Sequence, residues 1–131
     1  MKKDIDIPVV KDVFVAVVQD YNDVYKTTDW NAYIINFKDV TLEMILIVTR
    51  GYDESIGTSI MRHKLEKLPP KSYAKIELVQ EEVLELNNEF IVTYFEDNKM
   101  FDKTFLFRRN TINKRALQQI PLMKLKGVLV K

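Results

Sequence analysis

Apolar residues recur at every second position in several short runs of this chain, and this period constrains the fold most strongly. In residues 72–80 the alternating apolar residues are Ala74, Ile76 and Leu78. Successive side chains of a strand point to opposite faces, so this period predicts a half-buried strand. The aromatic and β-branched runs 90–95 and 103–107 flank the polar run 96–99 and predict a hairpin.

Other runs extend the pattern. Residues 30–37 and 42–49 flank the short segment 38–41, which predicts a second hairpin. Its strands are apolar on both faces, so we expect it to lie centrally. Further strands are expected at 13–19, 59–68 and 122–130. Residues 10–21 also carry an apolar stripe at helical spacing. Their many valines favour a strand, with a helix as the alternative.

Glycine and proline are sparse, with three and four residues, so each marks a boundary. Pro8 ends a charged arm at 1–8, and Pro69-Pro70 suits a corner between two sheets. A short helix is expected at 112–119, capped by Asn110 or Thr111 and stopped by Pro121. We therefore predict one all-β domain over 1–131, an immunoglobulin-like β-sandwich of about seven to eight strands, with a small β-barrel as the alternative.

Composition narrows the function classes. The 131 residues include no cysteine, so disulfides, thiolate metal sites and a cysteine nucleophile are excluded. The charged start resembles no signal peptide, and no apolar run approaches the roughly 20 residues of a membrane span. We expect a soluble, cytoplasmic protein. No two glycines have the spacing of a nucleotide-binding loop, and no cofactor or metal is expected.

Catalytic chemistry has few residues to draw on. His63 is the only histidine, and no Gly-x-Ser-x-Gly elbow surrounds any serine. A small hydrolase using His63 is our third hypothesis, and it requires a pocket that holds His63 beside a carboxylate or serine. The densest acidic cluster is interpreted as a solvated edge, namely Glu81, Glu82, Glu85 and Glu89. These observations favour a protein that is not an enzyme.

Charge is divided unevenly along the chain. Residues 1–60 hold six basic and ten acidic residues, and the remainder holds fourteen and nine, so a net charge of +1 conceals two opposite halves. No acidic residue follows Asp102. The basic segment could contact RNA, our second hypothesis, through Arg108, Arg109, Lys114 and Arg115. Alternatively, it could pair with the acidic first half.

Sheet edges suggest the leading hypothesis. Residues 61–67 are rich in charge, which is typical of a protected edge strand. Residues 128–130 are apolar and could pair centrally or with a second copy of the chain. We therefore expect a non-enzymatic sandwich that acts through protein contacts, as a homodimer or with a partner protein.

Four segments carry a resemblance that covers nearly the whole chain, namely 30–36, 68–72, 88–93 and 120–123. With them the chain resembles a small, functionally uncharacterised bacterial family, some of whose members are labelled phenylalanyl-tRNA synthetase alpha subunit. Such a synthetase needs an ATP-binding arginine followed closely by glutamate, and a Gly-rich motif ending in arginine. The sequence has neither, so the label finds no support here. The resemblance implies no site residues, only a complete small protein.

Overall fold

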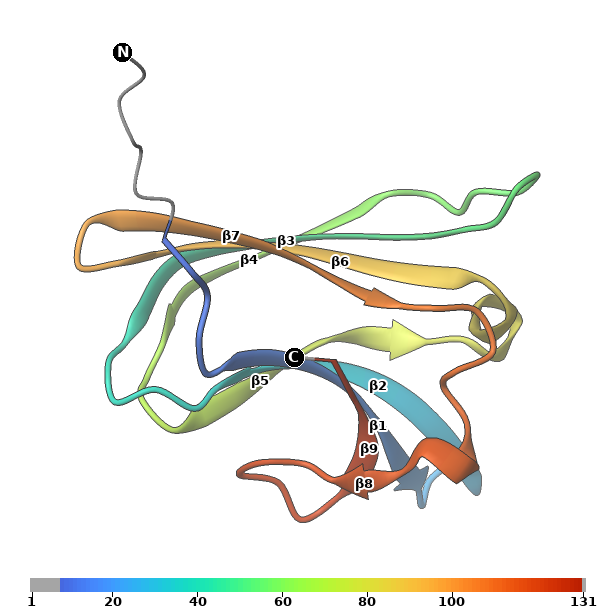
Figure 1. Ribbon diagram of the computed structural model, residues 1–131. Helices are drawn as coiled ribbons and strands as arrows, with labels where there is room; N and C mark the ends of the chain where they lie inside the picture. Colours follow the sequence, from blue (N-terminus) through green and yellow to red (C-terminus); the bar gives the residue numbers. More distant parts are fainter. Residues whose placement is uncertain (1–7, 131) are drawn as a thin grey trace.

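Two antiparallel sheets stack face to face in the computed structural model, which describes residues 8–130 (Figure 1). Sheet A has the strand order β5-β2-β1-β9-β8, and sheet B has the order β4-β3-β6-β7. The described strands do not close into a barrel, so the chain forms a β-sandwich. Nearly all of the expected arm at 1–8 lies outside the described residues.

The described residues form nine strands, of which β8 has only two residues, so the expected number of seven to eight is close. Their bounds are β1 Val13–Asn22, β2 Thr27–Asn36, β3 Leu42–Tyr52, β4 Met61–Leu68, β5 Ser72–Val79, β6 Asn87–Glu96, β7 Lys99–Phe107, β8 Gln118–Gln119 and β9 Lys126–Val130. The 3₁₀ helices are η1, Glu81–Glu85, and η2, Lys114–Ala116. The predicted helix at 112–119 is thus the single turn η2, and η1 was not predicted.

Most of residues 10–21 form strand β1, so the strand interpretation of this segment is confirmed and the helical alternative is wrong. Val13, Val15 and Val17 face the main core between the sheets. Ala16 and Val18 lie on the opposite face, in a second cluster with Ile120 and Met123 of the C-terminal segment. Because both faces of β1 are buried, its apolar residues are nearly continuous, which explains the apparent helical stripe.

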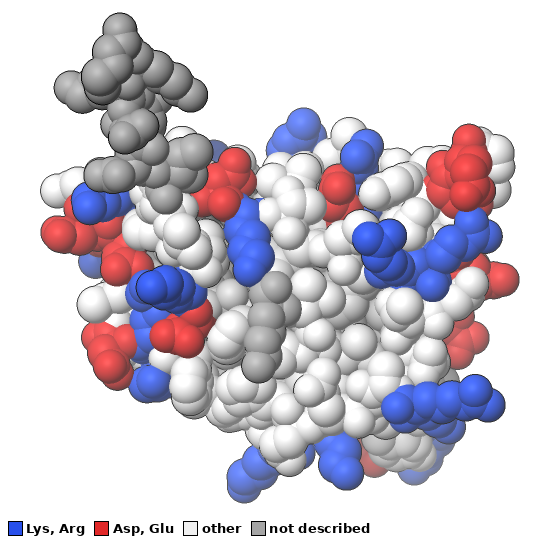
Figure 2. All heavy atoms as spheres, viewed as in Figure 1, with Lys and Arg blue, Asp and Glu red and all other residues white. Residues whose placement is uncertain are grey.

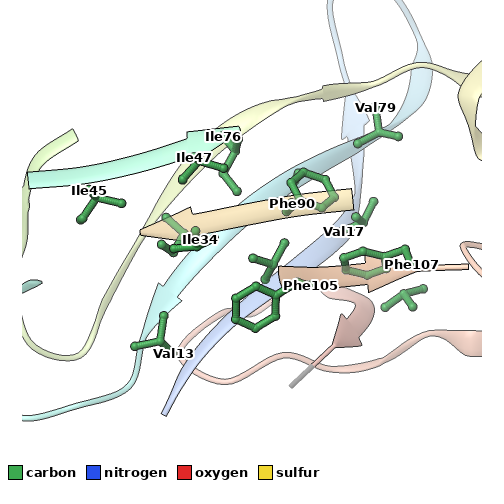
Figure 3. Close-up of a cluster of buried hydrophobic side chains, with 14 of the residues drawn as sticks. Val13, Val17, Ile34, Ile45, Ile47, Ile76, Val79, Phe90, Phe105 and Phe107 are labelled. Carbon is green, nitrogen blue, oxygen red and sulfur yellow. The ribbon is translucent and has the colours of Figure 1, made fainter. Parts of the chain in front are cut away.

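The hairpin predicted from runs 90–95 and 103–107 is confirmed as β6 and β7. Asp97 and Asn98 form its turn, with φ of 51° and 62°. Both residues tolerate this left-handed conformation, and two consecutive positive φ values match the twist of an antiparallel pair. The inward side chains of this hairpin, Phe90, Phe105 and Phe107 among them, fill the core with residues of both sheets (Figure 3).

The second predicted hairpin is wrong, because β2 belongs to sheet A and β3 to sheet B. Residues 37–41 carry the chain between the sheets. Buried Asn36 stabilises this crossing: its Nδ2 donates to the carbonyls of Val40, Leu68 and Pro69 at 2.8, 3.1 and 2.9 Å. Its Oδ1 accepts from the backbone N–H of Lys38 at 3.0 Å. The predicted corner at 68–72 is confirmed, since it joins β4 of sheet B to β5 of sheet A.

A β-bulge reverses the alternation of β5. Ala32 pairs with Glu77, whereas its neighbour Tyr33 pairs with Lys75, so Ile76 is the extra residue. Beyond the bulge, Val79 is buried and Leu78 is 48% exposed, the reverse of the expectation. The same reversal turns the Glu77 carboxylate toward sheet B.

The C-terminal segment covers the outer face of sheet A. Residues 120–125 place Ile120, Met123 and Leu125 against that face, before the chain enters β9. The strand expected at 122–130 is therefore limited to Lys126–Val130, which lies between β1 and β8. The charged strand β4 is an edge of sheet B, as expected.

Candidate functional site

His63, on β4, has a carboxylate partner from the opposite sheet. Its Nε2 lies 2.6 Å from Oε1 of Glu77, and the Thr49 hydroxyl of β3 donates to the same oxygen at 2.9 Å. With Glu77 ionised, the proton of the first bond lies on Nε2. The His63 side chain is 27% exposed and that of Glu77 is 24% exposed. This cluster therefore bonds β5 of sheet A to β3 and β4 of sheet B near an edge of the sandwich.

A pocket of about 390 Å³ adjoins this cluster, and its lining includes Thr49, Ser59, Glu77 and Asn88. Its main polar groups already have partners. Asn88 Nδ2 donates to the carbonyls of Val83 and Leu86, and Arg50 Nε lies 2.8 Å from Oε1 of Glu89. An acyl-transfer triad requires a hydroxyl bonded to the histidine. Here the hydroxyl and the imidazole both bond to Glu77, which stands between them.

The acidic cluster lies mostly on the surface. Glu81, Glu82 and Glu85 are exposed on η1, while Glu89 on β6 is bound to Arg50. Paired-carboxylate chemistry needs two carboxyls facing each other across a cleft. None of these four has such a partner among the contacts of residues 8–130.

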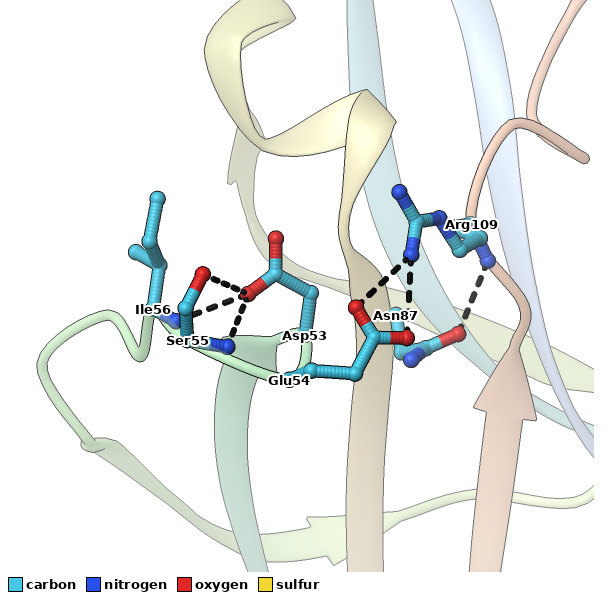
Figure 4. Close-up of polar contacts among 6 residues, drawn as sticks. All are labelled: Asp53, Glu54, Ser55, Ile56, Asn87 and Arg109. Atoms are coloured by element: carbon cyan, nitrogen blue, oxygen red, sulfur yellow. Dashed lines mark hydrogen bonds and ion pairs between the residues drawn. The ribbon is translucent and has the colours of Figure 1, made fainter.

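Arg109 is engaged in a structural contact (Figure 4). Its Nη1 lies 3.3 Å from both carboxylate oxygens of Glu54, and its backbone N–H donates to Asn87 Oδ1 at 2.9 Å. The neighbouring Asp53 accepts the backbone N–H groups of Ser55 and Ile56, which hold the pKa of its carboxyl below the usual range. The β3–β4 loop is thus joined to the end of β7.

The other basic candidates are exposed and have no ion pair among the described residues. Arg108 follows β7, whereas Lys114 and Arg115 lie on η2, whose first turn is capped by Asn113 Oδ1. Ala116 of the same turn packs against the core. On the face drawn in Figure 2, Lys and Arg side chains are interspersed with Asp and Glu and separated by uncharged surface. Within the described chain, basic residues of the second half pair with acidic residues of the first at Arg109–Glu54 and Lys71–Asp39.

The outer face of sheet B is apolar at its centre. Two cross-strand rows define it: Arg62, Val48, Ile91 and Thr104 form one, and Lys64, Leu46, Thr93 and Asp102 form the other. Figure 1 shows no other described element over this face, whereas the outer face of sheet A is covered by residues 120–125. The central side chains are half-buried.

Sequence reasoning missed Glu77, because the bulge that turns it inward is set by pairing with β2 and leaves no local signal. The apolar outer face of sheet B is visible in the sequence, because β3 carries apolar residues at both its even-numbered and its odd-numbered positions. We interpreted that pattern as a central position in a sheet, but it also fits a strand whose second face no other described element covers (Figure 1).

No family model and no curated protein matches this sequence. No helix within residues 8–130 is long and apolar enough to span a membrane. Within the same residues, no three histidine, aspartate or glutamate side chains are grouped so that they could hold a metal ion.

Proposed function

We propose that this chain is a non-enzymatic binding protein that acts through protein contacts, and that the outer face of sheet B joins two copies in a homodimer. The observation that carries the proposal is the difference between the two outer faces. An antiparallel sheet that faces water usually has polar residues on that side. The uncovered face instead places Leu46, Val48 and Ile91 at the centre of its rows.

The charges at the rim of this face are self-complementary. Arg62 and Lys64 lie on β4 at one flank, and Asp102 lies on β7 at the other. A two-fold axis parallel to the strands would set β4 of one copy over β7 of its partner. Each basic flank would then meet an acidic residue around an apolar centre, the arrangement common in protein interfaces.

The size of the face sets the expected affinity. Four strands about 4.8 Å apart, with a rise of about 3.3 Å per residue, give a face of roughly 500 Å² per copy. That is below the roughly 800 Å² per partner of a standard interface, so we expect a weak dimer, with Kd in the micromolar range.

Strand order supports the finer proposal of an immunoglobulin-like sandwich. Strands β1, β2 and β5 share sheet A, while β3, β6 and β7 share sheet B. Strands A, B and E and strands C, F and G divide in the same way in the immunoglobulin fold. In this comparison β4 lies beside β3, the counterpart of strand C. Strands β8 and β9 have no counterpart and lie next to β1, the counterpart of strand A.

The cytoplasmic location that we also propose rests on the absence of cysteine.

Light scattering coupled to size exclusion tests the dimer between about 1 and 500 µM. We expect the mass to rise from 15.5 kDa toward twice that value. Val48→Glu should keep the chain monomeric throughout, because it places a charge at the centre of the face. Ile56→Lys, which changes an exposed loop residue, is the matched control and should dimerise normally. A wild-type monomer at 500 µM, or an unaffected Val48→Glu dimer, would overturn the proposal.

A further inference from the structure

The end of the β1–β2 hairpin carries a hollow of about 720 Å³ on the outer side of sheet A, away from the proposed dimer face. Asp20 and Asp29 lie directly opposite each other on the two strands. Like charges in this position repel and destabilise a sheet. Asp23 also lines the hollow, and the lining includes one cationic residue, Lys75. No ion pair to any of these aspartates is found within residues 8–130.

The oxygen of a buried amide that lines the same hollow has no hydrogen-bond partner among the described residues. Asn31, two residues from Asp29 on β2, is only 6% exposed, and its Oδ1 has no donor among the described residues. A buried oxygen without a donor costs about 1–3 kcal/mol. Asn31 also lines the hollow, and its Oδ1 is sealed from solvent, so a ligand donor reaches it only after the Asn31 side chain turns toward the hollow.

The hollow therefore presents several acceptors, and the Lys75 ammonium adds a donor beside them. Asp20, Asp29 and Asn31 Oδ1 present oxygens, and the Thr27 hydroxyl is already engaged with Asp29 at 3.2 Å. The exposed rings of Tyr21 and Tyr25 line the same hollow. Burial, followed by the negative charge of Asp20, raises the pKa of the Tyr33 hydroxyl.

We propose that this hollow binds the guanidinium group of an arginine side chain. A guanidinium is planar and carries five N–H donors, so it can bond to both opposed carboxylates and to Asn31 Oδ1 together. Its flat face stacks on tyrosine rings, which a compact ammonium does less well. A metal ion is a poorer occupant, because the described residues provide no group of three acidic or histidine ligands.

Titration of ¹⁵N-labelled protein with N-acetyl-arginine amide, followed by NMR, tests the site. We expect saturable shifts at Asp20, Asp29 and the Asn31 side-chain amide, with a Kd in the millimolar range and weaker binding at higher salt. N-acetyl-lysine amide should bind several-fold more weakly. The neutral isostere N-acetyl-citrulline amide should not bind. Equal binding of all three amides, or the same shifts from CaCl₂ alone, would overturn the proposal.

Variants separate binding from stability. Asp20→Asn should weaken binding of the arginine amide at least tenfold and raise the melting temperature of the free protein, because it removes the cross-strand repulsion. Asp97→Asn, a charge change at the distant β6–β7 turn, should alter neither. If Asp20→Asn binds normally, the site is wrong. Binding of an acetylated Gly-Arg-Gly amide shows where the bound guanidinium comes from. Tighter binding than that of the single arginine amide indicates an arginine within a polypeptide, and equal binding indicates that the hollow contacts the arginine side chain alone.

Because the hollow lies on sheet A, this proposal does not depend on the dimer. Failure of arginine binding would leave the mass measurements unaffected, and a monomeric protein could still bind arginine.

Discussion

Asn36 is fully buried and bonds to both segments that cross between the sheets. Asn36→Ala removes the donor to three carbonyls and the acceptor of the Lys38 N–H. Leaving such buried groups unpaired should lower the free energy of unfolding by about 2–4 kcal/mol. Urea denaturation followed by fluorescence of Trp30, the single tryptophan, measures the change. Asn113→Ala, which removes the cap of η2 and the donor to the Asn110 carbonyl near the surface, should cost about 1 kcal/mol. Equal losses in the two variants would contradict this assignment.

Tyr94 is buried, and its hydroxyl has no hydrogen-bond partner among the described residues. Tyr94→Phe should therefore raise the free energy of unfolding by about 1 kcal/mol at neutral pH. The stacking of its ring on Phe101, with centroids 5.2 Å apart, is retained in this variant. A loss of stability on substitution would show that the hydroxyl makes a bond that these contacts do not include.

Tyr94 should also make the stability of the protein depend on pH in the alkaline range. Burial, followed by the negative charge of Glu96, raises the pKa of Tyr94 in the folded state. An unfolded tyrosine ionises near pH 10, so above this pH the unfolded chain releases a proton that the native state retains. The contribution of Tyr94 to the free energy of unfolding should be fully present below about pH 10 and should be lost as the pH rises further. Thermal melts from pH 8 to 11 should show a shallower decline for Tyr94→Phe. Tyr25→Phe, at an exposed site, should follow the wild type.

Strand β9 docks on β1 through Gly127. A Cβ at this position would lie 2.6 Å from the Val17 carbonyl oxygen and 2.9 Å from the Val18 Cα, both backbone atoms that cannot move aside. Gly127→Ala should therefore separate β9 from β1 and cost about 1–3 kcal/mol. Amide exchange in β9 should accelerate. At Gly57 an added Cβ meets nothing within 4 Å, so Gly57→Ala should change stability by less than about 0.5 kcal/mol. Similar effects of the two substitutions would argue against close packing at Gly127.

Strands were predictable where local pattern and tertiary pairing agree. The β6–β7 hairpin has a turn whose residues suit positive φ, and its strands pair with each other. Residues 38–41 look equally turn-like, but Asn36 bonds to residues 68 and 69, which are distant in sequence. The direction of Glu77 depends on a bulge opposite β2. The contact between Glu77 and His63 was therefore beyond the reach of periodicity, although His63 itself was identified.

The whole molecule depends on pairings between distant parts of the chain. β1 pairs with β9, so the first and last described strands meet. Such non-local topologies close long loops before they gain contacts, and they fold in milliseconds to seconds. Stopped-flow refolding followed by Trp30 fluorescence should give one main exponential phase in this range. A main phase in microseconds would show that local structure dominates folding.

The bulge in β5 has an evolutionary consequence. A single additional residue, Ile76, determines whether Glu77 faces the opposite sheet or the solvent. Insertion or deletion of one codon is therefore the smallest genetic change that could create or remove the carboxylate contact with His63. Among descendants of this gene, the length of this strand would report the contact more faithfully than the identity of the residue at either end of it.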